Sequence, residues 1–485
     1  MLLPLGVIGA VVLVVLGQVG GFDMAVFVGL ATALTVAALA SLEFGVLALI
    51  VAASLDGFLK GLSPGWHTQL LKDYLLAICL LRWGWLSVLG HRRRSVRHPL
   101  SIPIIIFAGW CVVQLLNERN PNVIMSLTNL RSWVIWLPVF FLAYDYLHTR
   151  QQVERFVITI FAILTPLALY GIVQYQIGLD HLFQLGPGFD VYEQAQYATG
   201  TYEIELRPPS TMISPHSFAD ACAMGLCLGI GAIGYLSRRR VTQSLITVAM
   251  PVLAAGVLIT AVRNAYASTA AGVLVLLGLI RRPDLIVLAT LIGGLALVEV
   301  DQLTGGRAME RLNTIVTDPE YTRNRIVTPW KTAMGWVARH PLGSGFTSGV
   351  GRGRLLWSID PRRVRPEERT PWAENEYARA LIELGVPGFL VFAWMLVSIV
   401  RFVFRAYRQS TQSRDRWLIV GIFAAIVSML VRLLVGSALY GWPEAIMFWC
   451  YVAVALRLPE IEVEELTGTA APIVTVKERP VAVQR

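Results

Sequence analysis

Apolar runs of about twenty residues recur along almost the whole chain, and a helix of that length crosses about 30 Å of hydrocarbon. Only 15% of the 485 residues are charged, whereas soluble domains carry about 25%. We therefore expect an all-α, polytopic helical membrane protein with about 14 transmembrane helices, in a range of about 12 to 14. Residues 3–19 are predicted to be a first span because no signal-peptide cleavage pattern follows them.

The predicted spans divide the chain into four parts. Residues 1–300 hold about eleven spans with short loops, and one longer outer loop lies at about 178–211. A large polar loop is predicted at 301–376. Residues 377–457 hold about three more spans, and residues 458–485 form a short polar tail that is expected to be disordered.

Arginine clusters between the predicted spans orient the chain. Arg92–Arg94, Arg238–Arg240 and Arg281–Arg282 fall on one side if the spans alternate, and arginine-rich short loops remain in the cytoplasm. Both termini are then cytoplasmic, and the polar loop at 301–376 lies outside. Because these arginines account for the net charge of +9, we expect no nucleic-acid partner.

The usual signatures of metal and nucleotide chemistry are missing from the sequence. It has no phosphate-binding glycine loop, no zinc helix and no nucleophile elbow, and its outer loops have no paired acidic motif. The five cysteines lie in apolar runs without zinc spacing, so we interpret them as small buried hydrophobic residues. We expect neither a metal ion nor a cofactor.

The polar loop is the most informative stretch. Between residues 301 and 375 there are 12 Lys/Arg and 8 Asp/Glu, so the loop is basic although it is expected outside. Loops longer than about 60 residues are exempt from the orientation rule, and the excess of positive charge therefore needs another explanation. We predict that it serves an anionic ligand.

Several arginines are expected at the outer face. They are Arg131, Arg207, Arg263, Arg323, Arg325 and Arg432. If guanidinium groups converge there, they would form a bidentate site for phosphate or pyrophosphate. The alternative for each is an interfacial anchor, which suits Arg131 and Arg432 best. It suits Arg263 least, because a lone arginine in a tight outer turn goes against the orientation rule.

Acidic residues follow at the end of the polar loop. Glu374 precedes a predicted span, where it could cap the helix or act as a general base at the membrane surface. Glu376 and Glu383 are rival bases, although Glu383 falls inside the span and suits a structural role. His216, Asn375 and Tyr377 are candidate contacts to the rest of the substrate, and His216 could equally be structural.

Four segments together resemble the O-antigen ligase and O-antigen polymerase superfamily of bacterial envelope proteins. They are RPPSTMISPHSFA from Arg207, TAVRNAYAS around Arg263, RNRIVTPWKTAMGWVARHPLGSGF from Arg323, and ENEYARALIELGVPGFLVF from Glu374. The resemblance covers roughly residues 100–460. It implies an integral-membrane type C glycosyltransferase of the inner membrane, inverting and metal-independent, that uses an undecaprenyl-pyrophosphate-linked glycan at the periplasmic face.

The resemblance also suggests roles for residues. Arg207 and Arg263 correspond to the arginines with which the family binds pyrophosphate, and Arg131 lies where the family often has a basic residue. Family ligases place a histidine where this chain has Glu374, directly before Asn375. This departure favours a polymerase, or transfer to another acceptor, over ligation to lipid A–core. Such an enzyme would act in O-antigen, exopolysaccharide or capsule assembly.

Two other functions remain open from the sequence. The chain could transport an anionic solute or a lipid-linked glycan, although transporters concentrate polar residues and broken helices at mid-depth. It could also be a structural partner in an envelope-assembly complex. Besides the lipid-linked glycan, possible partners are membrane lipids and a chain-length regulator or other glycan-assembly protein.

Overall fold

The structure, a computed structural model, describes residues 22–62, 65–89, 94–120, 123–178, 181, 189, 207–280, 283–317, 320, 323–346, 371 and 373–467. Within these ranges all regular structure is helical, which confirms the all-α fold class. Three predicted features lie outside the described residues: the span at 3–19, most of the loop at 178–211, and the end of the tail after residue 467.

The helices follow one another with short connections. In chain order they are α2 (Phe22–Ala40), α3 (Leu42–Ser54), α4 (Asp56–Leu62), α5 (Trp66–Val88), α6 (Arg94–Arg97), α7 (Ser101–Val113), the 3₁₀ helix η1 (Gln114–Leu116), α8 (Val123–Val134), α9 (Leu137–Tyr146), α10 (Arg150–Ile177), α13 (Pro215–Tyr235), α14 (Arg240–Ile259), α15 (Arg263–Ile280), α16 (Pro283–Leu303), α17 (Arg307–Thr317), the π-helix η3 (Arg323–Val327), α19 (Thr328–Val337), α21 (Glu376–Gln409), α22 (Ser413–Arg432) and α23 (Glu444–Thr467).

Fewer helices meet the requirements of a membrane span than the sequence predicts. Among the described residues, 6 are long and apolar enough, or up to 7 if the bent pair α3 and α4 counts as one. The predicted count of about 14 is therefore not confirmed. One reason is length, since α7 has only 13 residues, and another is charge, since the first turn of α22 contains Arg414, Asp415 and Arg416.

Two segments contain more helix than the sequence predicts. The stretch expected to be a loop from residue 301 begins with the last turn of α16 and continues into α17, η3 and α19. The expected tail from residue 458 begins with the last turns of α23, which ends at Thr467. These turns are polar but remain helical because their carboxylates are paired with arginines on neighbouring elements.

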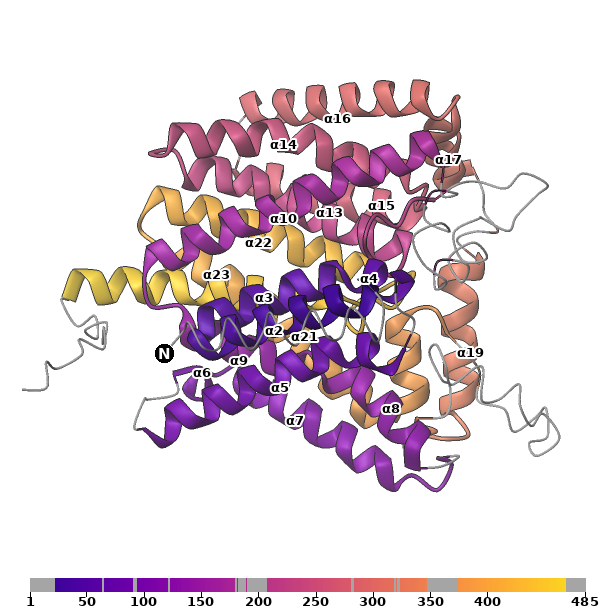
Figure 1. The fold of residues 1–485 in the computed structure, drawn as a ribbon. Coiled ribbons are helices and arrows are strands. Elements are labelled where there is room, and N and C mark those ends of the chain that lie inside the picture. The colour runs from indigo at the N-terminus through magenta and orange to yellow at the C-terminus, as the bar shows by residue number, and fades with distance from the viewer. Residues whose placement is uncertain are drawn as a thin grey trace, which may run out of the picture.

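The long helices run side by side along one common direction (Figure 1). α13 packs against α14, α15 and α22. Its contact with α22 is close because two glycines face each other: a Cβ atom on Gly231 would lie 2.9 Å from the Cα atom of Gly421. Small residues commonly allow such close approach between membrane helices.

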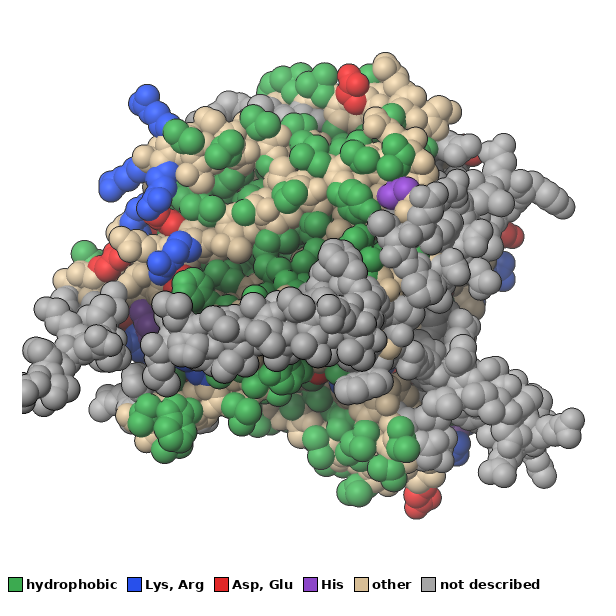
Figure 2. Space-filling view, viewed as in Figure 1, with side chains coloured by type: hydrophobic (Ala, Val, Ile, Leu, Met, Phe, Trp, Pro, Cys, Tyr) green, Lys and Arg blue, Asp and Glu red, His purple; other side chains and the backbone are tan. Residues whose placement is uncertain are grey.

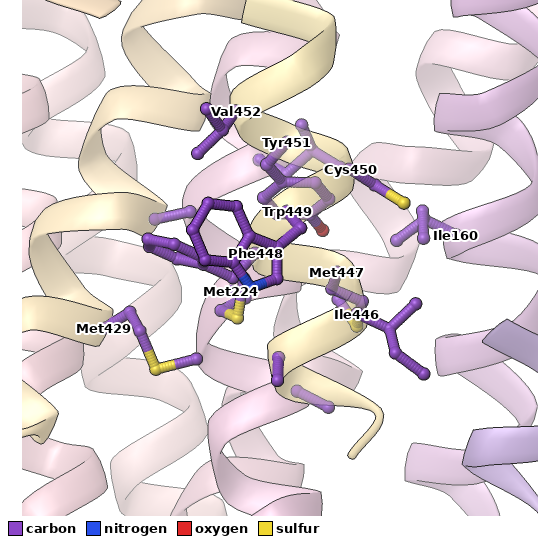
Figure 3. Close-up of a cluster of buried hydrophobic side chains, with 14 of the residues drawn as sticks. Ile160, Met224, Met429, Ile446, Met447, Phe448, Trp449, Cys450, Tyr451 and Val452 are labelled. Carbon is purple, nitrogen blue, oxygen red and sulfur yellow. The ribbon is translucent and has the colours of Figure 1, made fainter. Parts of the chain in front are cut away.

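α23 forms the centre of the bundle. Its residues from Ile446 to Val452 are buried on every side, and they lie among Ile160 of α10, Met224 of α13 and Met429 of α22 (Figure 3). A helix that is apolar all round belongs in such a core. The five cysteines are buried thiols, as the sequence predicts.

The bundle has two polar ends. At the arginine-loop end, where α10 and α22 begin and α23 ends, Arg150 pairs with Asp415 and Glu465, and Arg239 pairs with Glu154. Lys and Arg side chains are visible at this end (left in Figure 2). At the opposite end, the site end, α13 and α21 begin and α22 ends. The predicted site residues gather there.

Candidate functional site

Three arginines from separate segments converge on His216 at the site end. The guanidinium groups of Arg432, Arg207 and Arg325 lie within electrostatic range of its imidazole. His216 is the second residue of α13, whose start is fixed by Ser214: its hydroxyl oxygen accepts a hydrogen bond from the backbone N–H of Ser217 at 3.1 Å. By its solvent-accessible area the His216 side chain is exposed, Arg207 and Arg325 are half-buried and Arg432 is buried, so the cluster reaches the surface at His216.

Glu374 adjoins this cluster through Arg325. The two side chains form an ion pair and remain partly exposed, at 32% for Glu374 and 41% for Arg325. The structure thus places a solvent-accessible carboxylate beside a group of guanidiniums. Guanidinium groups can bind an anionic ligand, and a carboxylate beside them can accept a proton from a neighbouring hydroxyl group.

The chain immediately after Glu374 is held rigidly. The buried carboxylate of Glu376 accepts hydrogen bonds from the backbone N–H groups of Ala438, at 2.8 Å, and Leu439, at 3.2 Å. The hydroxyl of Ser437 donates to the carbonyl of Glu374 itself at 3.2 Å. Hydrogen bonds therefore hold the segment that contains Glu374 between α21 and the connection from α22 to α23.

Two predicted substrate contacts, Asn375 and Tyr377, form hydrogen bonds that hold the same segment. Asn375 is fully buried and is the N-cap of α21, because its side-chain oxygen accepts from the backbone N–H groups of Tyr377 and Ala378 at 3.0 and 3.1 Å. The hydroxyl of Tyr377 donates to the carbonyl of Leu430 at 3.0 Å. The Oδ1 atom of Asn375 and the hydroxyl of Tyr377 are thus engaged within the protein, whereas the buried Nδ2 atom of Asn375 has no hydrogen-bond partner among the described residues. We interpret Asn375 and Tyr377 as positioning residues.

The rival bases are also engaged. Glu383 is fully buried and accepts hydrogen bonds from the indole of Trp133, at 2.6 Å, and from Nε of Arg379, at 3.1 Å. Glu376 is bound to backbone N–H groups, as described above. Of the three acids considered from the sequence, Glu374 alone is accessible to an acceptor hydroxyl.

α21 is broken two residues after Glu383. Gly385 has a φ of 70°, which is costly for other residues, and Pro387 lacks a backbone N–H. The break exposes carbonyl groups, and residues 341–346 pair with them: Ser344 and Gly345 donate their backbone N–H groups to the carbonyls of Ile382, at 2.9 Å, and Glu383, at 3.1 Å.

Side chains of α7 and η1 form further hydrogen bonds with the carbonyl groups at this break. The indole of Trp110 and the amide of Gln114 both donate to the carbonyl of Leu384, at 2.9 and 3.2 Å. Gln114 also donates to the carbonyl of Leu342 at 2.8 Å. The Pro-Leu-Gly-Ser-Gly part of the third motif thus closes the broken helix, and by doing so positions the helix that carries Glu374.

Arg432, for which the sequence leaves open an interfacial anchor or a part in an anion site, is buried. Its Nε atom lies 2.9 Å from a carboxylate oxygen of Asp220 on α13. Among the described residues its Nη1 atom has no hydrogen-bond partner. Sequence reasoning missed this pair because its members are 212 residues apart.

Arg131 differs from the other candidates. Its guanidinium forms a bidentate ion pair with Asp73 of α5, with Nε and Nη2 at 2.9 and 2.6 Å from a single carboxylate group. Arg131 is not among the arginines whose charge acts on His216, and two of its nitrogens are bound by one carboxylate, so we favour the anchor interpretation of Arg131.

Arg263 and Arg323 lie at the edge of the cluster. Arg263 begins α15, and the side-chain amide of its neighbour Asn264 donates to the carbonyl of Val435 at 3.4 Å. The start of α15 is therefore next to the connection that holds Glu374. Arg323 is exposed on the same short π-helix as Arg325.

The segment that carries Arg207 is anchored on the bend between α3 and α4, which is 56°. The hydroxyl of Thr211 donates to the carbonyl of Ser54 at 2.7 Å, and the backbone N–H of Phe58 donates to the carbonyl of Thr211 at 2.9 Å. A buried charge cluster follows at the same bend, where Asp56 accepts from Lys72, at 3.0 Å, and from the indole of Trp442, at 2.7 Å. No local sequence pattern indicates this cluster.

Within the described ranges, no group of three or more His, Cys, Asp or Glu side chains is placed to hold a metal ion. The polar groups that do converge are guanidinium groups, which bind phosphate oxygens directly. The candidate site thus consists of Arg207, Arg325, Arg432, His216 and Glu374, with Arg263 nearby.

Comparison with known families assigns part of the chain. A family described as O-antigen ligase matches residues 248–393. This range includes Arg263, Arg325, Glu374 and the break in α21, so it coincides with half of the site and with the helix that positions it. Comparison with curated proteins gives no match.

Proposed function

We propose that this chain, which matches the O-antigen ligase family over residues 248–393, is an inverting glycosyltransferase that polymerises undecaprenyl-pyrophosphate-linked oligosaccharides. The observation that carries the proposal is the convergence of Arg207, Arg325 and Arg432 around His216, next to the accessible carboxylate of Glu374. Pyrophosphate is the ligand that such a cluster suits, since guanidiniums bind its oxygens in pairs.

The orientation of the protein follows from its two ends. Arginine-rich short loops stay in the cytoplasm, so the arginine-loop end is assigned to the cytoplasm of the bacterial inner membrane, together with both termini. The site end then faces the periplasm. The sugar of a lipid-linked donor would lie in water there, with its pyrophosphate at the membrane surface.

The reaction needs one base and one anion site. Glu374 takes the proton of the acceptor hydroxyl, whose oxygen attacks the anomeric carbon of the donor. The bond between that carbon and the pyrophosphate oxygen breaks, and the pyrophosphate leaves with the electron pair. A single displacement inverts the configuration and uses one carboxylate, unlike the pair in a retaining glycosidase.

The arginines stabilise the leaving group. Negative charge grows on the pyrophosphate as the bond breaks, and fixed cations at that position lower the barrier. We propose that they replace the divalent metal used by other glycosyl transfers. In the free protein Arg325 is paired with Glu374, so the donor pyrophosphate competes for Arg325 and its binding frees the carboxylate to accept a proton.

Our proposal for the acceptor substrate rests on the identity of the residue before Asn375. A glutamate stands there, and its carboxylate is accessible from the solvent side. We therefore favour a second lipid-linked repeat as acceptor, which gives a polymer for O-antigen, exopolysaccharide or capsule. A ligase would use another acceptor with the same chemistry.

The test uses the purified full-length protein, an undecaprenyl-pyrophosphate oligosaccharide and EDTA, with products separated on a gel. Wild type should give a ladder, and Glu374→Gln should give none although it keeps the size and hydrogen-bonding capacity of the side chain. Glu310→Gln is the matched control, because Glu310 is an exposed acid of the same polar stretch on α17. A ladder with Glu374→Gln would exclude this base, and no ladder with wild type would exclude the polymerase.

A further inference from the structure

A large cavity lies away from the candidate site, among α13, α14, α15, α16 and α22. Its volume is about 1040 Å³, at the upper limit of about 1,000 Å³ for sites of drug-sized ligands. Most of its lining is apolar, including Leu226, Met250, Val257, Val273 and Trp417. Side chains of this kind suit hydrocarbon chains.

One end of the cavity is polar. Arg238, Gln243, Gln412, Ser413 and Arg414 line it where α13 ends and where α14 and α22 begin. This is the arginine-loop end of the bundle. The cavity therefore matches the two parts of a lipid: its apolar walls suit acyl chains, and the cationic rim at one membrane surface suits an anionic headgroup.

The two rim arginines differ from Arg150 and Arg239 at this end. Arg239 is bound to Glu154 at 2.8 Å and Arg150 to Asp415 at 2.7 Å. Arg414 donates a hydrogen bond to the neutral side-chain oxygen of Gln412 at 3.1 Å, and its contact with Asp415, whose carboxylate is already bound to Arg150, is long at 3.8 Å. Arg238 is exposed and forms no ion pair within the part of the chain that the structure describes.

We propose that this cavity binds an anionic phospholipid from the leaflet at the arginine-loop end. Its phosphate binds to Arg238 and Arg414, and its acyl chains fill the apolar part. A neutral lipid would leave the cationic rim unused, and so would an isoprenoid tail that entered from the site end. The inference stands apart from the proposed reaction, because it uses none of the site residues.

The position of the cavity suggests what the lipid does. α13 and α22 line it and carry His216 and Arg432 at their opposite ends, and α15 lines it from Tyr266, which lies one turn after Arg263. A lipid between them would fix their spacing. Because a ligand that binds only the folded state stabilises it by mass action, anionic lipid should raise the thermal unfolding temperature of the purified protein.

The test is native mass spectrometry of the delipidated full-length protein, titrated with phosphatidylglycerol or phosphatidylcholine. Wild type should prefer phosphatidylglycerol. Arg238→Gln/Arg414→Gln should weaken that binding by about 30-fold, from about 1 kcal/mol for each arginine near a phosphate. Ala270→Phe should also weaken it, because Ala270 lines the cavity.

The matched control is Arg401→Gln/Arg405→Gln. It removes the same charge from exposed positions near the same end of α21, outside the cavity, and should leave phosphatidylglycerol binding unchanged. Equal loss in both double variants would overturn the site, because the attraction would then be unspecific. Displacement of phosphatidylglycerol by undecaprenol, with no effect of Arg238→Gln/Arg414→Gln, would also overturn it and assign the cavity to an isoprenoid tail.

Discussion

The two ends of the bundle use arginine in opposite ways. At the arginine-loop end the buried guanidinium of Arg150 is neutralised by Asp415 of α22 and Glu465 of α23, and that of Arg457 by Glu460 and Glu464 of its own helix. At the site end Arg207, Arg325 and Arg432 converge on one histidine; Arg432 is bound to the buried Asp220, and the exposed acid of the group is Glu374. The three arginines outnumber these two carboxylates, and convergent like charges are unfavourable without an anion. The buried arginines of the first end therefore serve stability, and the convergent arginines of the second serve a ligand.

The largest effect is expected from a buried pair at the arginine-loop end. Asp415→Ala leaves Arg150 buried and without its closest partner, and breaking such pairs costs about 3–5 kcal/mol. Thermal unfolding in detergent should show this loss, while the donor KM of the folded fraction stays the same. A changed KM with unaltered stability would contradict the division between the two ends.

The break in α21 tests how the site end is positioned. A Cβ atom on Gly385 would lie 2.3 Å from the backbone of Leu342, in addition to its positive φ. Gly385→Ala should therefore cost about 2–4 kcal/mol from strain and overpacking, with loss of polymer formation.

Gly335→Ala is the control for this prediction. Gly335 is an exposed helical residue of α19, and a Cβ atom there would meet nothing within 4 Å. Because alanine favours helix, the substitution should stabilise the protein by about 0.5–1 kcal/mol. If both substitutions proved harmless, the hydrogen bonds between residues 341–346 and the break in α21 would not be what positions α21.

Arg325→Gln should separate function from stability. The pair of Arg325 with Glu374 is partly exposed, so its loss should change the free energy of unfolding by less than about 1 kcal/mol. A charged hydrogen bond to the donor is worth about 1.5–3 kcal/mol, and the donor KM should rise by about 10- to 150-fold. Steady-state kinetics alongside thermal unfolding would show both.

Arg131→Gln should have the smallest effect. Its guanidinium is bound to Asp73 in a partly exposed pair, and such pairs contribute about 0–1 kcal/mol. The donor KM should change by less than about threefold, which corresponds to about 0.7 kcal/mol. A rise in KM like that of Arg325→Gln would instead make Arg131 part of the pyrophosphate site.

The sequence predicts local features of this protein well. The apolar runs indicate the helical class, and Gly385 with Pro387 two residues later is a recognisable signal for a helix break. Arg207 and His216 could be named because each is polar near a predicted span end, and Arg325 because it lies in the basic polar loop; the structure brings all three together.

Partners distant in sequence could not be predicted. The carboxylate of Asp73 lies 58 residues from Arg131, and that of Asp220 lies 212 residues from Arg432, so nothing local distinguishes an anchor from a buried ion pair. Asn375 and Tyr377 are predicted from the sequence to contact substrate, and it does not reveal that their side chains also bind backbone groups. Those hydrogen bonds depend on where α21 begins, and a sequence places helix ends only within a few residues.

The central claim is that the arginines bind the donor while Glu374 reacts. It is tested most directly by the equilibrium binding of a radiolabelled undecaprenyl-pyrophosphate oligosaccharide to wild type, Glu374→Gln and Arg207→Gln/Arg325→Gln in EDTA. We predict that Glu374→Gln binds at least as tightly as wild type but forms no polymer, because Arg325 is released from its pair, and that the double arginine variant loses binding. Equal affinity in all three proteins would contradict the account.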